Sequence, residues 1–79
     1  MSKRLNEVAV GKECVVISIE GEGRLRRRLF DMGVTPHATI YVRKVAPLGD
    51  PVEVTIRGYE LSLRKDEARL VLVEVKEGD

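Results

Sequence analysis

The chain has 79 residues, enough for one small domain, and its 14 basic residues are nearly balanced by 13 acidic ones. A domain of this size buries roughly 60% of its unfolded-chain surface and seldom encloses both a deep pocket and a set of catalytic groups. The balanced charge argues against a dedicated nucleic-acid binder, whose affinity would come from an excess of Lys and Arg over phosphate. Because aromatic residues make up only 4% of the chain, we expect an aliphatic core.

The single cysteine, Cys14, excludes an intrachain disulfide and is typical of a reducing cytoplasm. No apolar run approaches the roughly 18 residues that read as a membrane-spanning helix. The N-terminal residues lead into no apolar segment of the kind found in signal peptides. We therefore expect a cytoplasmic protein without direct membrane insertion, with residues 1–79 forming a single domain and residues 76–79 frayed.

The N-terminal segment predicts one turn of helix followed by a strand. Leu5 and Val8 lie three residues apart ahead of Gly11, as in a single helical turn. Apolar residues then alternate along residues 14–20, which predicts a strand. The residues expected to face the core from this strand are Val15, Ile17 and Ile19.

The apolar spacing changes after this strand. Leu25, Leu29 and Met32 lie at positions i, i+4 and i+7, which predicts a short helix with one apolar stripe. Gly33 stands where a C-cap glycine is typical, and Pro36 prevents the helix from continuing.

The C-terminal half predicts four more strands and a turn of helix. The strands are expected over residues 39–45, 52–57, 59–63 and 70–75, with the turn of helix over residues 64–68. Five short strands can close into a small, strongly bent barrel that leaves no exposed edge. The expected fold class is therefore mainly β: a small SH3-like five-stranded barrel with one short α-helix inserted after the first strand. The predicted core comprises Val15, Ile17, Ile19, Leu25, Leu29, Ile40, Val42, Val54, Ile56, Leu61, Leu63, Val71 and Val73.

The loop of residues 46–51 carries the most informative local pattern. Pro47 and Pro51 hold the residues before them extended, and they keep the flanking strands from pairing up to the tip. Gly49 supplies the backbone angle of the turn, and Asp50 can accept a hydrogen bond from a nearby backbone N–H. The pattern predicts a stiff loop, which serves either as a partner-binding surface or as a connector that sets strand register.

Motifs for catalysis or metal binding are weak. Gly21 and Gly23 precede a predicted helix, as in a phosphate-binding turn, but the third glycine of the dinucleotide fingerprint is missing and an ordinary turn is favoured. Cys14 and His37 lie too far apart in the sequence to suggest a metal site within one chain. Without a Ser, His and Asp set or paired inward carboxylates, we predict no enzymatic activity, no cofactor and no bound metal.

A run of four arginines lies on the predicted helix. On a helix, Arg24, Arg26, Arg27 and Arg28 spread around most of the circumference. Arg28 lies beside the apolar stripe, where its stem can pack and its guanidinium can donate to backbone carbonyls. RNA binding would use such a run, but the aromatic stacking platforms are missing, so a solvated helix face with one packed arginine is favoured.

Three ordered blocks of the chain resemble a known family. They are residues 23–33, the loop of residues 46–51 and residues 57–68, with Leu5 and Gly11 ahead of them. Together they are similar to the ferrous iron transport protein A family, the FeoA-like domains. His37 departs from the family pattern, which usually has a glycine there, so this turn either does not need a positive φ or carries strain.

The resemblance implies an SH3-like barrel and a function. The expected protein is a cytoplasmic, non-catalytic accessory module of ferrous iron uptake. It binds the cytoplasmic part of the membrane transporter FeoB. In one alternative, it also forms a homo-oligomer. Because the same fold occurs in iron-dependent repressors, a nucleic-acid-binding or repressor-type regulatory module is the other reading. The near-neutral charge and the lack of a helix-turn-helix segment disfavour it.

Two surfaces are candidates for binding the partner. One is the loop, through Pro47, Leu48, Gly49, Asp50 and Pro51; the other is the outer helix face with Arg27 and Phe30. Leu48 and Phe30 are apolar residues without an evident core role, unless Phe30 caps the barrel end and Leu48 folds back onto it. The loop is favoured because a pre-ordered loop loses less entropy on binding.

Overall fold

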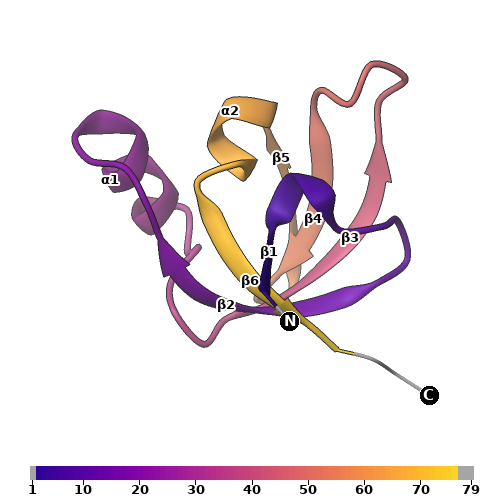
Figure 1. The fold of residues 1–79 in the computed structure, drawn as a ribbon, viewed down its shortest axis with the longest axis horizontal. Helices are drawn as coiled ribbons and strands as arrows, with labels where there is room; N and C mark the ends of the chain where they lie inside the picture. Colours follow the sequence, from indigo (N-terminus) through magenta and orange to yellow (C-terminus); the bar gives the residue numbers. More distant parts are fainter. Residues whose placement is uncertain (1, 77–79) are drawn as a thin grey trace.

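The structure is a computed structural model that describes residues 2–76 as a strongly curled antiparallel sheet with two short α-helices (Figure 1). In chain order the elements are β1 (Ser2–Arg4), the 3₁₀ helix η1 (Leu5–Glu7), β2 (Glu13–Ile19), α1 (Arg24–Asp31), β3 (Thr39–Val45), β4 (Val52–Ile56), β5 (Tyr59–Leu63), α2 (Lys65–Ala68) and β6 (Val71–Val75). The mainly β fold class is confirmed. Of the tail expected to be frayed, residues 77–79 lie outside the described residues, whereas the Lys76 N–H donates to the Glu13 carbonyl at 2.9 Å.

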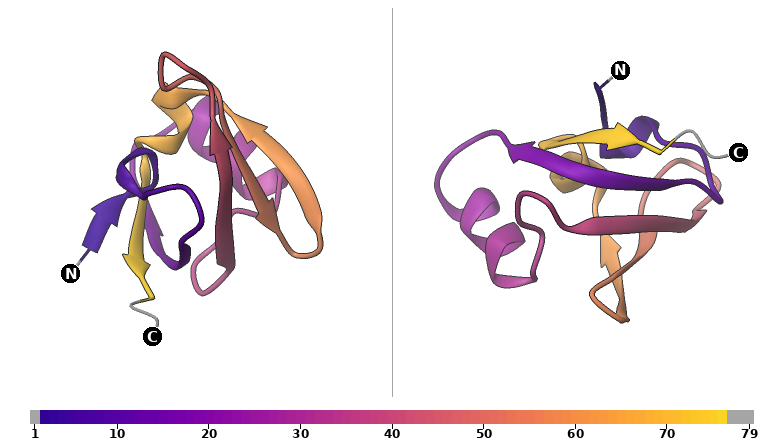
Figure 2. Two further views of the ribbon diagram at one scale, coloured as in Figure 1. Left: turned by 90° about the vertical axis from the view of Figure 1, so that its right-hand side faces the viewer. Right: turned by 90° about the horizontal axis from the view of Figure 1, so that it is seen from below.

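The sheet has six strands rather than the five expected, in the order β1-β6-β2-β3-β4-β5. The sequence does not predict β1 because its residues, Ser2–Arg4, show no apolar alternation; the strand forms by pairing with β6, where Arg4 lies opposite Leu72. This extra strand places α1 after the second strand instead of the first. The sheet curls around its core, with β1 and β5 as its two edges (Figure 2).

Strand β2 faces the core with residues other than those predicted. Cys14 and Val16 are 0% and 1% exposed, whereas Ile17 is 44% exposed and Val15 is half-buried. The pairing of β2 with β6 shifts between Val16 and Ser18, as at a β-bulge, and this shift returns Ile19 to the buried face. The prediction of Val15 and Ile17 as core residues is therefore wrong. It rests on a strict alternation of buried and exposed residues up to Ile19, and the bulge interrupts that alternation.

Only the last part of α1 reaches the core. Leu29 is completely buried, and Phe30 and Met32 pack against the core, but Leu25 is 38% exposed. Leu25 lies one turn earlier in a helix that projects from the sheet (Figure 1). The prediction of Leu25 as a core residue is wrong for this reason.

The end of α1 has the glycine cap that the sequence predicts. Gly33 has a φ of +92°, and its N–H donates to the Phe30 carbonyl at 3.0 Å. The next N–H, of Val34, reaches back to the Leu29 carbonyl at 2.9 Å, which completes a Schellman motif. The motif turns the chain so that Val34 enters the core with 0% exposure.

The turn between α1 and β3 has backbone strain at His37, which is one of the two alternatives expected from the sequence. Its φ is +78°, a left-handed conformation that costs a residue with a Cβ about 1–2 kcal/mol. The His37 N–H donates to the Val16 carbonyl at 2.8 Å, so pairing with β2 holds the strained residue in place.

The remaining predicted core residues are confirmed, apart from Leu61, which is partly buried against the core. Each of the following is at most 1% exposed: Leu29, Ile40, Val42, Val54, Ile56, Leu63, Val71 and Val73. Leu5 and Val8, from the N-terminal helical turn, are also buried, although this turn ends at Val8 and not at Gly11. Within residues 2–76, no helix combines the length and apolar character needed to cross a membrane.

The two leucines of α1 give a matched test of this packing. Leu29→Ala removes a completely buried side chain and is expected to lower the free energy of unfolding by about 2–5 kcal/mol. Leu25→Ala, at a 38% exposed position of the same helix, is expected to lower it by less than about 1 kcal/mol. Urea denaturation measures both, and equal losses would contradict the described orientation of α1.

Candidate functional site

The loop between β3 and β4 is held by hydrogen bonds at its base and to α2. The Ala46 N–H donates to the Pro51 carbonyl at 3.1 Å, and the Gly49 N–H donates to the Ala46 carbonyl at 2.7 Å. Asp50 accepts a backbone hydrogen bond, as the sequence suggested, but from the N–H of Lys65 in α2, at 3.1 Å from Oδ1. These bonds connect the loop to an element 15 residues further along the chain.

The tip of this loop presents an apolar side chain to solvent. Leu48 is 90% exposed, so it does not fold back onto the core or onto Phe30. Pro47 beside it is also exposed, while Gly49 adopts the turn with a φ of +82°. The loop therefore holds an exposed leucine on a hydrogen-bonded frame.

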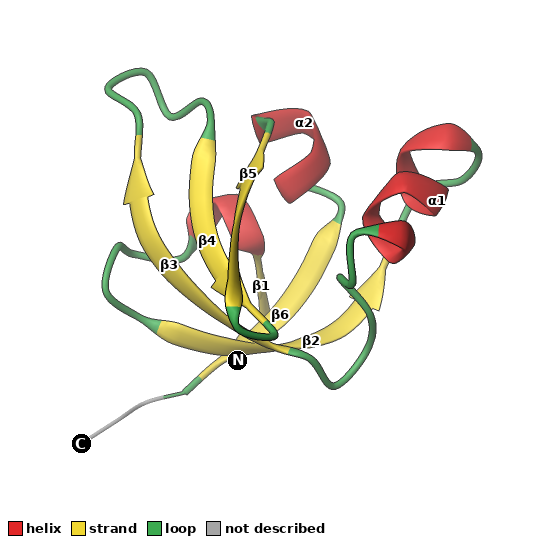
Figure 3. Ribbon diagram, turned by 180° about the vertical axis from the view of Figure 1, so that it is seen from behind, coloured by secondary structure: helices red, strands yellow, loops and turns green. Residues whose placement is uncertain are grey.

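The helix-face candidates lie apart from this loop, with α2 between them (Figures 1 and 3). Phe30 is partly buried against the core, and the Arg26 guanidinium lies over its ring at 4.7 Å from the centroid. Arg26 is also the arginine of this helix that bonds a backbone carbonyl, since its Nε donates to Ile19 O at 3.1 Å. Arg27 is exposed and lines a pocket with Phe30 and the Gly21–Gly23 turn.

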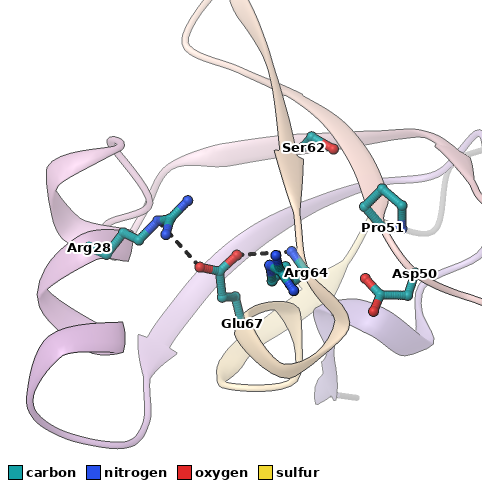
Figure 4. A pocket seen from close by; sticks show the side chains of 6 residues that line it. All are labelled: Arg28, Asp50, Pro51, Ser62, Arg64 and Glu67. Carbon is teal, nitrogen blue, oxygen red and sulfur yellow. Dashed lines mark hydrogen bonds and ion pairs between the residues drawn. The ribbon is translucent and has the colours of Figure 1, made fainter.

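A second shallow pocket, of about 430 Å³, collects residues from four separate segments (Figure 4). Its lining comprises Arg28 of α1, Asp50 and Pro51 of the loop, Ser62 of β5, Arg64 and Glu67. Of these, only Asp50 and Pro51 are among the site residues predicted from the sequence. The segments are distant in sequence, so no local pattern indicates that they meet.

Glu67 is the buried charge of this pocket, at 1% exposure. Its Oε1 accepts the Arg64 N–H at 2.9 Å, which caps the start of α2, and its Oε2 lies 3.4 Å from the Arg28 Nε. Arg28 was expected to donate to backbone carbonyls; instead it pairs with a carboxylate on the other helix. A buried carboxylate is costly unless it is paired, and these two donors supply the pairing.

The titratable groups show little sign of reactive chemistry. Among residues 2–76, no three His, Cys, Asp or Glu side chains are placed to hold a metal ion together. Cys14 is buried, and this burial, with a smaller effect of Glu13, raises the pKa of its thiol to about 11. A buried thiol with a raised pKa is a poor nucleophile.

The fold defines a small, mainly β domain of the SH3-like kind. Comparisons with known proteins show the family to which it belongs. The model of the FeoA domain family matches residues 3–75. The chain therefore belongs to the FeoA domain family, a family linked to ferrous iron transport.

One curated relative is a fusion protein. It is the Fe(2+) transport protein A/Fe(2+) transporter FeoB fusion protein of Porphyromonas gingivalis, 40% identical over 72 residues. The match covers 91% of this chain and 8% of that protein, so the chain spans a small part of that relative's length.

Solved structures agree with the fold. The NMR structure of a FeoA-like protein from Clostridium acetobutylicum superposes with a TM-score of 0.91 at 44% identity, covering 99% of this chain and 91% of that chain. Stenotrophomonas maltophilia FeoA, complexed with zinc and described as a procaryotic SH3 domain protein, superposes with a TM-score of 0.78 at 26% identity, covering 94% and 89%. A manganese-dependent transcriptional repressor shares the fold alone, at 16% identity and a TM-score of 0.88, covering 95% of this chain and 41% of that chain.

The pairing of the two helices through Glu67 gives a test of the pocket's construction. Glu67→Gln keeps an acceptor for the Arg64 N–H but removes the charge facing Arg28, and should lower the free energy of unfolding by about 1–2 kcal/mol. Combining it with Arg28→Gln should cost less than the sum of the single changes, with a coupling energy of about 1 kcal/mol because Arg28 is largely solvated.

A matched control for this cycle is Glu20→Gln with Arg4→Gln, a pair whose side chains are 46% and 38% exposed. Exposed pairs contribute little, so the control coupling should be smaller. Urea denaturation of the seven proteins, the parent being common to both cycles, decides the comparison. A coupling no larger in the Glu67 cycle than in the control would contradict a structural role for the buried carboxylate.

The raised pKa of Cys14 makes stability depend on pH in the alkaline range. The native thiol keeps its proton up to a pKa of about 11, whereas an unfolded thiol loses it near about 8.5. The unfolded state therefore binds fewer protons between these values, and the free energy of unfolding should fall as pH rises through this window. Urea midpoints at pH 8 and pH 10 should differ more for the parent than for Cys14→Ala; equal differences would contradict the prediction.

Proposed function

We propose that the protein is a cytoplasmic accessory module of ferrous iron uptake that acts without catalysis by binding the cytoplasmic part of the transporter FeoB. The observation that carries this proposal is the fusion relative, in which an Fe(2+) transport protein A and FeoB form one chain. Joining two domains by a linker raises their effective concentration toward each other, which is useful when the two associate. An association of this kind requires a surface on the FeoA-like domain that binds FeoB.

The fold supports a surface-binding role. The interior is filled by packed aliphatic side chains, so binding has to use loops and shallow pockets. The β3–β4 loop is the favoured contact because Leu48 is 90% exposed on a loop already fixed by hydrogen bonds. Fixing the loop in advance reduces the entropy lost on binding. The face with Arg27 and Phe30 is the alternative, although Phe30 is partly covered by its own neighbours.

The nucleic-acid alternative has less support. The formal net charge is only +1, and sequence-independent binding to phosphate depends on an excess of positive charge. The likeness to the manganese-dependent transcriptional repressor concerns the fold alone.

The proposal predicts that the protein binds the isolated cytoplasmic part of FeoB in calorimetry. Leu48→Ala should weaken this binding about tenfold, as expected for loss of an exposed apolar anchor, with an unchanged thermal melting midpoint. Val10→Ala is the matched control, since Val10 is also exposed, at 55%, but lies on the β1–β2 connection.

Leu48 is a cleaner test than Asp50, because Asp50→Ala also removes the hydrogen bond to α2. If the parent protein does not bind, the proposed function is wrong. If Leu48→Ala binds as tightly as the parent, the loop is only a connector and the helix face with Arg27 and Phe30 becomes the candidate.

A further inference from the structure

The pocket between α1, α2 and the base of the β3–β4 loop contains two arginines whose donors are only partly used. The Arg28 Nε faces Glu67, its two terminal nitrogens have no ion pair or hydrogen bond within residues 2–76, and its side chain is 62% exposed. Within residues 2–76, the Arg64 guanidinium has neither an ion pair nor a hydrogen bond. Ser62 adds an exposed hydroxyl to the same pocket.

The carboxylates of the pocket are already engaged by the fold. Glu67 is 1% exposed, and both of its oxygens face donors, the Arg64 N–H and the Arg28 Nε. Asp50 Oδ1 accepts the Lys65 N–H. The open donors therefore exceed the open acceptors, and Figure 4 shows Arg28 and Arg64 on either side of the Glu67 carboxylate.

A planar guanidinium presents paired N–H donors that match the two oxygens of a carboxylate or a phosphate. Two such groups and a hydroxyl in one pocket select an anion. Asp50 borders the pocket with its negative charge, so a dianionic phosphate would be repelled more than a singly charged carboxylate. The charge distribution thus favours a carboxylate.

The neighbouring surface suggests what carries that carboxylate. Pro51 lines the pocket, and Leu48 of the same loop is 90% exposed. An acidic side chain in the pocket would bring an adjacent apolar residue of the same ligand toward this loop. We propose that the pocket of Arg28, Ser62 and Arg64 binds an aspartate or glutamate side chain of a protein partner, within a segment that pairs this acidic residue with an apolar one. Identification of that partner as FeoB rests on the proposed function.

A small probe tests the pocket without any transporter. The probe is the blocked dipeptide N-acetyl-glutamyl-leucine amide, titrated into the ¹⁵N-labelled protein, with the glutaminyl counterpart and inorganic phosphate in parallel. The glutamyl probe should shift the backbone resonances of Ser62 and Arg64, and Arg64→Gln should remove the shifts. Arg24→Gln, at an arginine of α1 outside the pocket, should retain them.

Three results of this titration would overturn the proposal. They are equal shifts with the glutaminyl probe, larger shifts with phosphate, and no shift at Ser62 and Arg64 with the glutamyl probe. Arg64→Gln is preferred to Arg28→Gln because the Arg64 side chain has no partner among residues 2–76, whereas Arg28 pairs with the buried Glu67.

The partner experiment separates this inference from the proposed function. With the cytoplasmic part of FeoB, Arg64→Gln should raise the dissociation constant about tenfold, as for loss of a charge-assisted hydrogen bond, while Arg24→Gln leaves it unchanged. Absence of binding by the parent protein contradicts the proposed function, and the dipeptide titration still decides the pocket. Binding by the parent with equal constants for both variants contradicts the pocket as a FeoB site only.

Discussion

A carboxylate buried between the two helices determines how the parts of this domain fit together. Glu67 is removed from water, and its position is sustained by a backbone donor at the start of α2 and by Arg28 from α1. Because α1 projects from the sheet and anchors in the core through its last turn, the ion pair is a second attachment for this helix. Asp50 binds the first N–H of the same short helix, so α2 joins α1, the β3–β4 loop and β5 at one point.

This arrangement bears on how such a small protein can recognise a partner. Among residues 2–76 the core is filled with aliphatic side chains, and the two pockets described above are open to solvent, so specificity has to come from the surface. The loop and the pocket share Asp50 and Pro51, and both therefore lie against α2. A partner that covers this region would contact α1, the loop and β5 together, which are brought into one surface by tertiary structure alone.

Local sequence patterns predicted the strands and the helix end whose positions are determined by residues close together in the chain. The strands β3 and β5 and the glycine-capped end of α1 follow from alternation and from Gly33, and they are found where expected. The predictions failed where pairing with a strand distant in the sequence determines the structure. Strand β1 exists through its pairing with β6, and the bulge after Val16 exchanges the buried and exposed faces of β2. Both faces of β2 carry apolar residues, so alternation could not distinguish them. The pocket was missed because Arg28 lies in α1, whereas Arg64 and Glu67 lie at the start of α2 and within it, and only the tertiary structure brings the two helices together.

The strand order also has a kinetic consequence. Strands β3, β4 and β5 form two consecutive hairpins, and a two-residue turn at Arg57 and Gly58 connects β4 to β5. These strands can therefore pair after closing only short loops. Strand β6 instead lies between β1 and β2, from which most of the chain separates it. Contacts of such long sequence separation carry the larger loop-closure entropy and slow folding. We therefore expect the meander of β3 to β5 to form first, and β6 to insert between the two N-terminal strands as a late step.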